Sequence, residues 1–115
     1  MDRQQAVEIN DRRLLFDEEL RELQIQANGY QHTYFEPPES VRMQYDAIVY
    51  EKSAMNVRRA NNRSYSVRDG YKVTVISRDS ETPLPRMIQE HFERCAPERP
   101  FVTDNLYHFP FTIYY

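Results

Sequence analysis

The last ten residues alternate in character, and this pattern constrains the fold more than any other feature of the chain. From residue 106 to residue 115 the even positions are mixed, whereas the odd positions are all aromatic or apolar: Tyr107, Phe109, Phe111, Ile113 and Tyr115. A period of two over this length predicts a strand with one buried face. Pro110 cannot donate to a strand ladder, so it predicts an edge or a bulge. We expect residues 101–115 to form a C-terminal strand within a sheet.

Two further strands are expected within residues 45–78, separated by a long polar excursion. The stretches "QYDAIVYEK" and "YKVTVIS" predict the strands, and the first has apolar groups on both faces, which is typical of a strand covered on two sides. Residues 53–69, "SAMNVRRANNRSYSVRD", connect them. A connection of this length is uncommon between two strands of a compact domain, so we expect a projecting hairpin or arm.

Two helices complete the expected elements. Residues 6–28 carry a helical apolar stripe and end at Asn28-Gly29, a good C-terminal stop. The stripe consists of Phe16, Leu20, Leu23 and Ala27. Ser80 to Thr82 offer an N-cap and Pro83 a first helical residue for a second amphipathic helix. Pro37-Pro38 marks residues 30–44 as a connector, because neither a helix nor a central strand continues through two prolines.

The order of these elements predicts one α+β domain over residues 1–115. We expect a small mixed sheet of about four strands, packed by two helices, with a long projecting β-hairpin arm. Its segments are a leading helix at 1–29, a connector at 30–44, strands within 45–78 with the arm at 53–69, a second helix at 80–94 and a C-terminal strand at 101–115. If the strand at 71–78 and the C-terminal strand are neighbours, the helix between them predicts a parallel pair.

Composition narrows the function classes. The net charge of −3 argues against a general nucleic-acid binder. A single cysteine, Cys95, excludes an internal disulfide framework and favours a reducing compartment. The start of the chain is too polar for a signal peptide, and no run approaches the roughly 20 apolar residues of a membrane span. We therefore expect a soluble protein made in a cytoplasm, without a membrane partner.

The distribution of charge and of surplus apolar residues suggests contact with other chains. Residues 1–40 hold nine acids and four Arg, a net of −5, whereas residues 52–72 hold six Lys or Arg and one Asp, a net of +5. Val7, Leu14 and Ile25 fall on the side of the first helix opposite Phe16. The plainer interpretation is that both charged regions are solvated surfaces and that the three apolar residues are scattered without function. The interface candidates are Val7, Leu14, Ile25, Arg58, Arg59, Arg63, Tyr65 and Tyr114.

No chemical site is predicted, so we expect no enzyme, metal or cofactor. His91 and Cys95 are spaced like two metal ligands, but two ligands are not a site. A triad of Cys95, His108 and Asp104 lacks an accompanying nucleophile-elbow or oxyanion motif. With two glycines, the chain cannot build a phosphate-cradling loop. An alternative is single-stranded nucleic-acid binding by Arg58, Arg59, Arg63 and Arg68, with Tyr65 and Tyr71 as stacking platforms.

Three phrases, taken in order, resemble a known family. They are "YFEPPESVRMQYDAIVY" (34–50), "YKVTVISRDS" (71–80) and "FVTDNLYHFPFTIYY" (101–115). Together they resemble the tail terminator, or tail completion, proteins of long-tailed bacteriophages, which join the head to the tail. The similarity spans most of residues 34–115, with similar order and spacing. Residues 1–33 match only as a generic leading helix.

The resemblance implies a structural virion protein without catalysis or cofactor. Such a protein forms a homo-oligomeric ring, taken as a hexamer, that caps the tail tube at the head-proximal end of the tail. Its implied partners are the tail tube protein and a neck or head-completion protein, while DNA only passes through the lumen. Assembly takes place in the host cytoplasm. A head-side neck adaptor remains an alternative within the same class. A ring also requires a heterologous contact, to which an acidic helix and a basic arm on one chain are suited.

Overall fold

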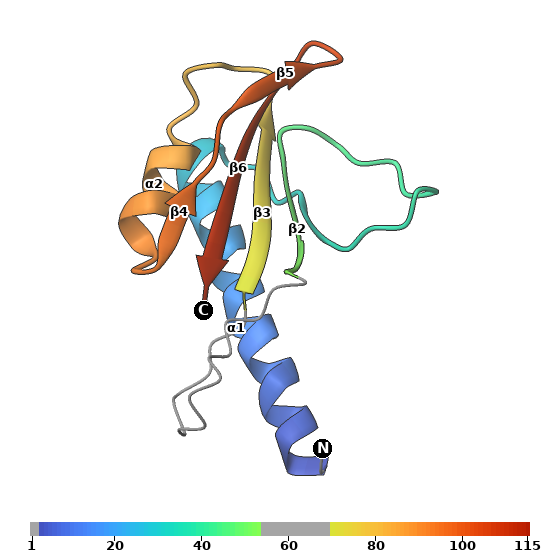
Figure 1. Ribbon diagram of the computed structural model, residues 1–115. Helices are drawn as coiled ribbons and strands as arrows, with labels where there is room; N and C mark the ends of the chain where they lie inside the picture. Colours follow the sequence, from blue (N-terminus) through green and yellow to red (C-terminus); the bar gives the residue numbers. More distant parts are fainter. Residues whose placement is uncertain (1–2, 54–69) are drawn as a thin grey trace.

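A mixed sheet with both helices on one face forms the fold of residues 3–53 and 70–115, the part of the chain that the computed structural model describes (Figure 1). This confirms the α+β class with two helices, although the described residues form six strands rather than about four. The strand order is β1-β2-β3-β6-β4, and β5 pairs with β6. The elements are α1 (Arg3–Asn28), β1 (Thr33–Phe35), β2 (Ala47–Lys52), β3 (Gly70–Ser77), α2 (Leu84–His91), β4 (Cys95–Pro97), β5 (Phe101–Thr103) and β6 (Leu106–Tyr114).

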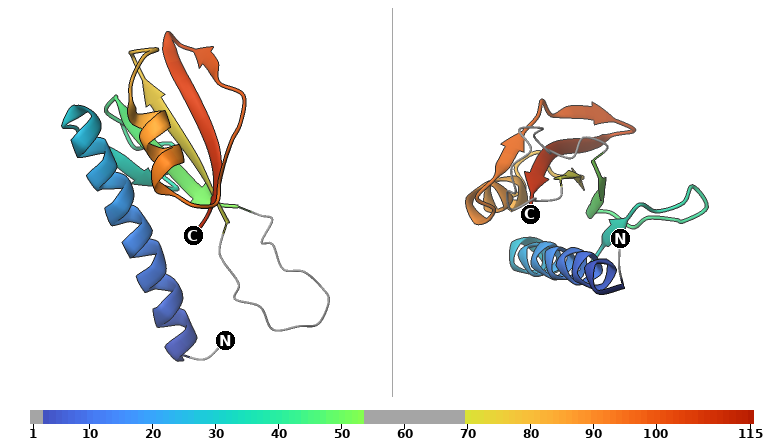
Figure 2. Two further views of the ribbon diagram at one scale, coloured as in Figure 1. Left: turned by 90° about the vertical axis from the view of Figure 1, so that its left-hand side faces the viewer. Right: turned by 60° about the horizontal axis from the view of Figure 1, so that its bottom comes forward.

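The core lies between the sheet and the two helices (Figure 2). The apolar stripe predicted for α1 is confirmed, since Phe16 and Leu20 are fully buried, Leu23 is buried and Ala27 packs against the core. Alternate residues of the central strands meet this stripe. The sheet and α2 contribute Ile48, Tyr50, Tyr71, Val73, Val75, Leu84, Ile88, Phe92, Phe111 and Ile113. Phe16 is the centre of an aromatic cluster, with ring centroids 4.6 Å from Tyr71 and 5.5 Å from Tyr50.

Both helix boundaries follow local chain chemistry. Gly29, at φ 81°, donates its N–H to Ile25 O at 2.9 Å and so ends α1 as predicted. In α2, Pro83 is the N-cap residue and the helix runs to His91, which is shorter than the expected 80–94. Phe92 is already extended at φ −94° and ψ 126°, and the chain turns there toward β4.

The C-terminal segment is a hairpin rather than one strand. Residues 101–115 split into β5 and β6 around Asp104 and Asn105, whose φ angles of 53° and 63° suit a two-residue type I′ turn. The conditional prediction of a parallel pair is wrong, because β6 pairs with β3 in antiparallel register. The reason is that the chain first passes along the far edge of β6 as β4 and β5, then turns back as β6.

The edge that pairs with β6 contains a bulge next to Pro110. The register of β4 on β6 pairs Pro97 with Phe111, whereas that of β5 pairs Phe101 with His108, so the edge carries one extra residue between them. Glu98 N donates to Pro110 O at 2.9 Å, which shows that the missing N–H of Pro110 faces this edge. The bulge predicted from Pro110 therefore exists, and it lies in the strand that pairs with β6.

The connector at 30–44 contains a strand that sequence reasoning missed. β1 pairs with β2 in parallel, with Thr33 opposite Ile48 and Phe35 opposite Tyr50. A strand of three residues is too short to show a period. The predicted arm at 53–69 is not tested, because residues 54–69 lie outside the described residues.

Candidate interaction surface

The side of α1 that faces away from the sheet carries exposed apolar side chains. Leu14 is 50% exposed, Leu15 52% and Ile25 40%. Leu14 and Ile25 were predicted from their spacing, and they share one face because eleven residues make about three turns. Leu15 was missed, since it is rotated by about 100° from Leu14 and belongs to no repeat. We call Leu14, Leu15 and Ile25 the α1 patch. Val7 belongs to α1, but its side chain lies outside the described residues.

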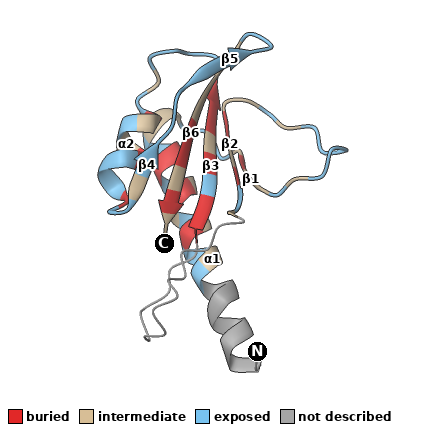
Figure 3. Ribbon diagram, viewed as in Figure 1, coloured by how far each residue is buried: buried red, intermediate tan, exposed pale blue. Residues whose placement is uncertain are grey.

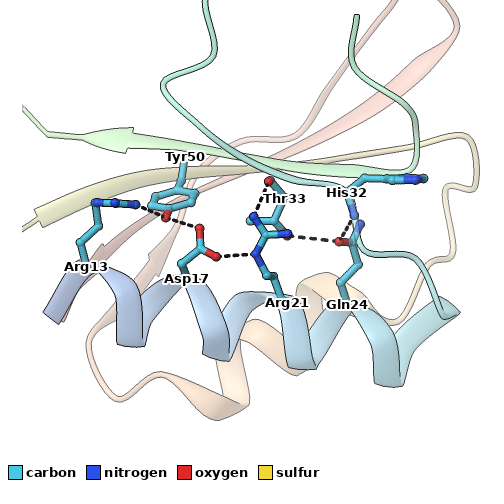
Figure 4. Close-up of polar contacts among 7 residues, drawn as sticks. All are labelled: Arg13, Asp17, Arg21, Gln24, His32, Thr33 and Tyr50. Atoms are coloured by element: carbon cyan, nitrogen blue, oxygen red, sulfur yellow. Dashed lines mark hydrogen bonds and ion pairs between the residues drawn. The ribbon is translucent and has the colours of Figure 1, made fainter. Parts of the chain in front are cut away.

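The other side of α1 is tied to the sheet by partly buried polar contacts (Figure 4). The Tyr50 hydroxyl donates to Asp17 Oδ2 at 2.5 Å and accepts from Arg13 Nη1 at 3.3 Å. Asp17 also pairs with Arg21 along the helix, and Arg21 Nη2 donates to Thr33 O at 3.0 Å. Burial and the Asp17 carboxylate raise the pKa of Tyr50 above its ordinary value, so the hydroxyl keeps its proton. These charges were interpreted as a solvated face, but they hold α1 in place.

Gln24 fixes the far end of α1 in the same way (Figure 4). It is fully buried, its amide donates to Asp46 O at 3.1 Å, and its carbonyl accepts from His32 N at 2.9 Å. The Asp46 carboxylate accepts from Ser77 Oγ at 2.7 Å. One buried amide thus connects α1 to the segments that precede β1 and β2. The orientation of the α1 patch relative to the sheet is therefore set by buried groups.

The C-terminal side chain anchors α1 a third time. The Tyr115 hydroxyl donates to Glu19, whose other oxygen lies 2.7 Å from His91 Nε2 on α2. Arg12 lies over the Tyr115 ring at 5.4 Å from its centroid. Burial and the hydrogen bond to Glu19 raise the pKa of Tyr115 to about 12. The half-buried Tyr115 side chain is thus held against α1 and α2 by contacts within the chain.

Tyr114, another predicted interface residue, makes a contact within the chain. It is half-buried, and its ring lies 2.9 Å from the position that a Cβ on Gly70 would occupy. That ring therefore covers the first residue of β3. The remaining predicted interface residues Arg58, Arg59, Arg63 and Tyr65 lie outside the described residues.

The residues considered for chemistry lie apart. Cys95 pairs with Ile113 and packs against the core, and burial raises the pKa of its thiol. His108 is an odd number of residues from Ile113, so it points to the opposite face, where it stacks on Phe101. His91 is engaged with Glu19. Within residues 12–53 and 70–115, whose side chains are described, no group of three or more His, Cys, Asp and Glu could hold a metal ion.

The face of the sheet away from the helices is mixed in character, because Ala47 and Ile76 are buried there whereas Lys72 is exposed. A hollow of about 380 Å³ lies there between the start of the 36–46 loop and strands β2 and β3. Its lining combines opposite charges with uncharged residues: Glu36, Pro37, Val49, Tyr50, Glu51, Lys72 and Thr74. Tyr71, a stacking platform in the nucleic-acid alternative, is fully buried against Phe16, so its ring cannot stack on a base.

A second exposed apolar surface lies on β5, at the upper end of the sheet in Figure 3. Phe101 is 50% exposed and Val102 is 61% exposed. They belong to the stretch expected as one C-terminal strand, but neither was predicted as an interface residue. In both views of Figure 2, β5 and α1 lie on opposite sides of the molecule. Two separate apolar surfaces are therefore available for contact with other chains.

Comparisons with known proteins add no relative to this description. No protein-family model, no curated protein and no solved structure matches the chain. Among the described residues, neither helix is long and apolar enough to cross a membrane.

Proposed function

We propose that the chain is a ring-forming structural subunit of a long-tailed bacteriophage, which caps the tail tube and joins it to the head. The observation that carries the proposal is the α1 patch. A helix that packs on one sheet needs one apolar face, and α1 exposes Leu14 and Ile25 on the opposite one. An outer helix face that exposes large apolar side chains is suited to contact with another chain.

The family-like phrases fall on the strands of the sheet. Residues 34–50 run from β1 through β2, residues 71–80 contain β3, and residues 101–115 contain β5 and β6. The resemblance therefore concerns the framework that holds α1. The resemblance supports a sheet in common with that family. The proposed ring is supported by the exposed apolar and charged side chains of α1.

The acidic character of α1 supports a contact with a basic surface. Glu18 and Glu22 are exposed beside the α1 patch, and neither makes an ion pair with another described residue. In a ring, one patch of each copy meets a different patch of the next copy, so unlike surfaces on one chain are required. Charge on the rim of such a contact would guide its orientation more than its affinity.

The test is end-specific binding to tail tubes. The full chain would be mixed with tubes of the phage that encodes it, and the tube ends imaged by electron microscopy. We expect a cap at one end, abolished by Leu14→Glu or Ile25→Glu and retained by Gln89→Glu, a matched change at an exposed position of α2. Binding to neck protein without binding to tubes would favour the head-side adaptor. Absence of binding to either would refute the proposal.

A further inference from the structure

The two outer edges of the sheet are protected differently. At the β1 edge, Thr33 O points away from β2 and is occupied by Arg21 Nη2 at 3.0 Å. On the opposite edge, Pro97 in β4 and Pro100 before β5 have no N–H to offer. Proline and covering side chains are the usual means by which proteins prevent edge strands from pairing with other chains. Among the described residues, β5 carries neither protection.

Backbone groups of Val102 point away from the sheet. Tyr114 N donates to Arg94 O at 3.0 Å, and Glu98 N donates to Pro110 O at 2.9 Å, so the even-numbered residues of β6 face this edge. In an antiparallel ladder, residue pairs that exchange two backbone hydrogen bonds alternate with pairs that exchange none. Phe101 and Thr103 lie opposite His108 and Leu106, so their backbone groups face β6. Val102, opposite Tyr107, therefore directs both its N–H and its C=O outward.

The side chains beside this edge are apolar and exposed on both faces of the strand. Phe101 lies on the face away from the helices, where its ring stacks on His108 at 4.7 Å between centroids. Val102 points to the other face and is the more exposed of the two, at 61%. An incoming strand would cover both side chains while it pairs with Val102. Such edge pairing is a common mode of recognition.

We propose that β5 pairs in antiparallel register with β5 of a second copy of this chain, about a two-fold axis at Val102. The two Val102 residues then form a bonded pair with two N–H···O=C hydrogen bonds. Phe101 of each copy lies opposite Thr103 of the other. Each copy contributes the same strand surface to the contact, as two-fold symmetry requires.

Charge at the ends of β5 selects the second copy and the antiparallel direction. Arg99 precedes β5 and Asp104 follows it; both are exposed, and neither makes an ion pair with another described residue. Antiparallel pairing centred on Val102 brings Arg99 of each copy beside Asp104 and Asn105 of the other. Parallel pairing would place like charges together. The strand is thus complementary to itself in one direction only.

The contact is small, so a weak dimer is expected. Three residues a side bury far less than the roughly 1,200 to 2,000 Å² of a stable interface. Dimerisation should therefore depend on protein concentration. The α1 patch lies on the opposite side of the molecule (Figure 2), so this dimer leaves it free. The inference is independent of the tail function.

Sedimentation equilibrium of the full chain over a wide concentration range tests the pairing. Val102→Pro removes the outward N–H without removing a bond to β6, and we expect self-association to fall about tenfold or more. Val102→Thr keeps the backbone donor and a β-branched side chain, so it should still dimerise. Leu14→Glu, which removes any contact through the α1 patch, should leave the dimer through β5 in place. Circular dichroism checks that each variant is folded. A wild-type chain that stays monomeric throughout, or dimers unaffected by Val102→Pro, would overturn the proposal.

A cysteine trap and a charge reversal test the register. In a Cys95→Ser background, Val102→Cys should form a disulfide-linked dimer, because a bonded antiparallel pair has Cα atoms about 5.5 Å apart, within disulfide reach. Gln89→Cys, at another exposed position, on α2, should not. Arg99→Glu should weaken the dimer, and adding Asp104→Asn, which suits the positive φ of that turn, should partly restore it. Equal cross-linking of both cysteines, or no restoration, would contradict the antiparallel register.

Discussion

The hydrogen bond from Tyr50 to Asp17 provides a measurable test of how α1 is held on the sheet. The Tyr50 side chain is 1% exposed, and its hydroxyl lies 2.5 Å from Asp17 Oδ2. Tyr50→Phe removes that hydroxyl and leaves the ring in place. A hydrogen bond to a charged group contributes about 1.5–3 kcal/mol. Because Asp17 keeps its ion pair with Arg21, we expect a loss of about 2 kcal/mol in the free energy of unfolding.

A double-mutant cycle isolates this bond from other effects of each substitution. Tyr50→Phe, Asp17→Ala and the double variant would be unfolded in urea and followed by circular dichroism. We expect a coupling free energy of about 1.5–2 kcal/mol between the two positions. Glu18→Ala, at the exposed neighbouring carboxylate, is the matched control and should show no coupling to Tyr50→Phe. A coupling below about 0.5 kcal/mol for Asp17 would refute the assignment of this contact as an anchor of α1.

Three further predictions concern the turn after α1, the ring that covers Gly70 and the C-terminal anchor. Gly29→Ala should lower the free energy of unfolding by about 1 kcal/mol, because φ is 81° there; Gln31→Ala is the exposed control, and equal loss in both would contradict the reasoning. Gly70→Ala should cost about 1 kcal/mol, since its Cβ would lie 2.9 Å from the Tyr114 ring, and a Tyr114→Ala background should remove that cost. Folding raises the pKa of Tyr115 from 10.0 to about 12, so its contribution is complete below pH 10 and is lost as pH rises through 12. Thermal melts between these pH values should therefore fall less steeply for Tyr115→Phe than for the wild type, and identical slopes would sink the idea.

The elements that were predicted correctly are long ones whose apolar residues repeat with a single period, because one face of each element is buried. Phe16, Leu20 and Leu23 repeat with the helical period because α1 buries one face, and that face is the one in contact with the sheet. The odd residues of the last stretch alternate because β6 has one face under the helices. Leu14 and Ile25 were predicted to be exposed by the same geometry. Burial patterns of long elements can be read without knowing their neighbours.

The parts that were not predicted depend on pairing between short segments. β1, β4 and β5 have three residues each, which is too few for a period. Their place is set by pairing with longer strands: β1 pairs with β2, and both β4 and β5 pair with β6. The roles of Asp17 and Glu19 were missed for the same reason, because each finds its Tyr partner only in the folded chain.

The unequal protection of the two sheet edges argues that β5 has a partner. The β1 edge is occupied by a side chain from α1, Arg21, and the β4 segment is interrupted by proline. A chain that protects one edge by these means would be expected to protect the other if pairing there were harmful. Instead, β5 places its outward backbone groups at its most exposed apolar residue, Val102. Outward backbone groups at an exposed apolar residue are suited to pairing, and the charges at the two ends of β5 specify which strand can pair with it.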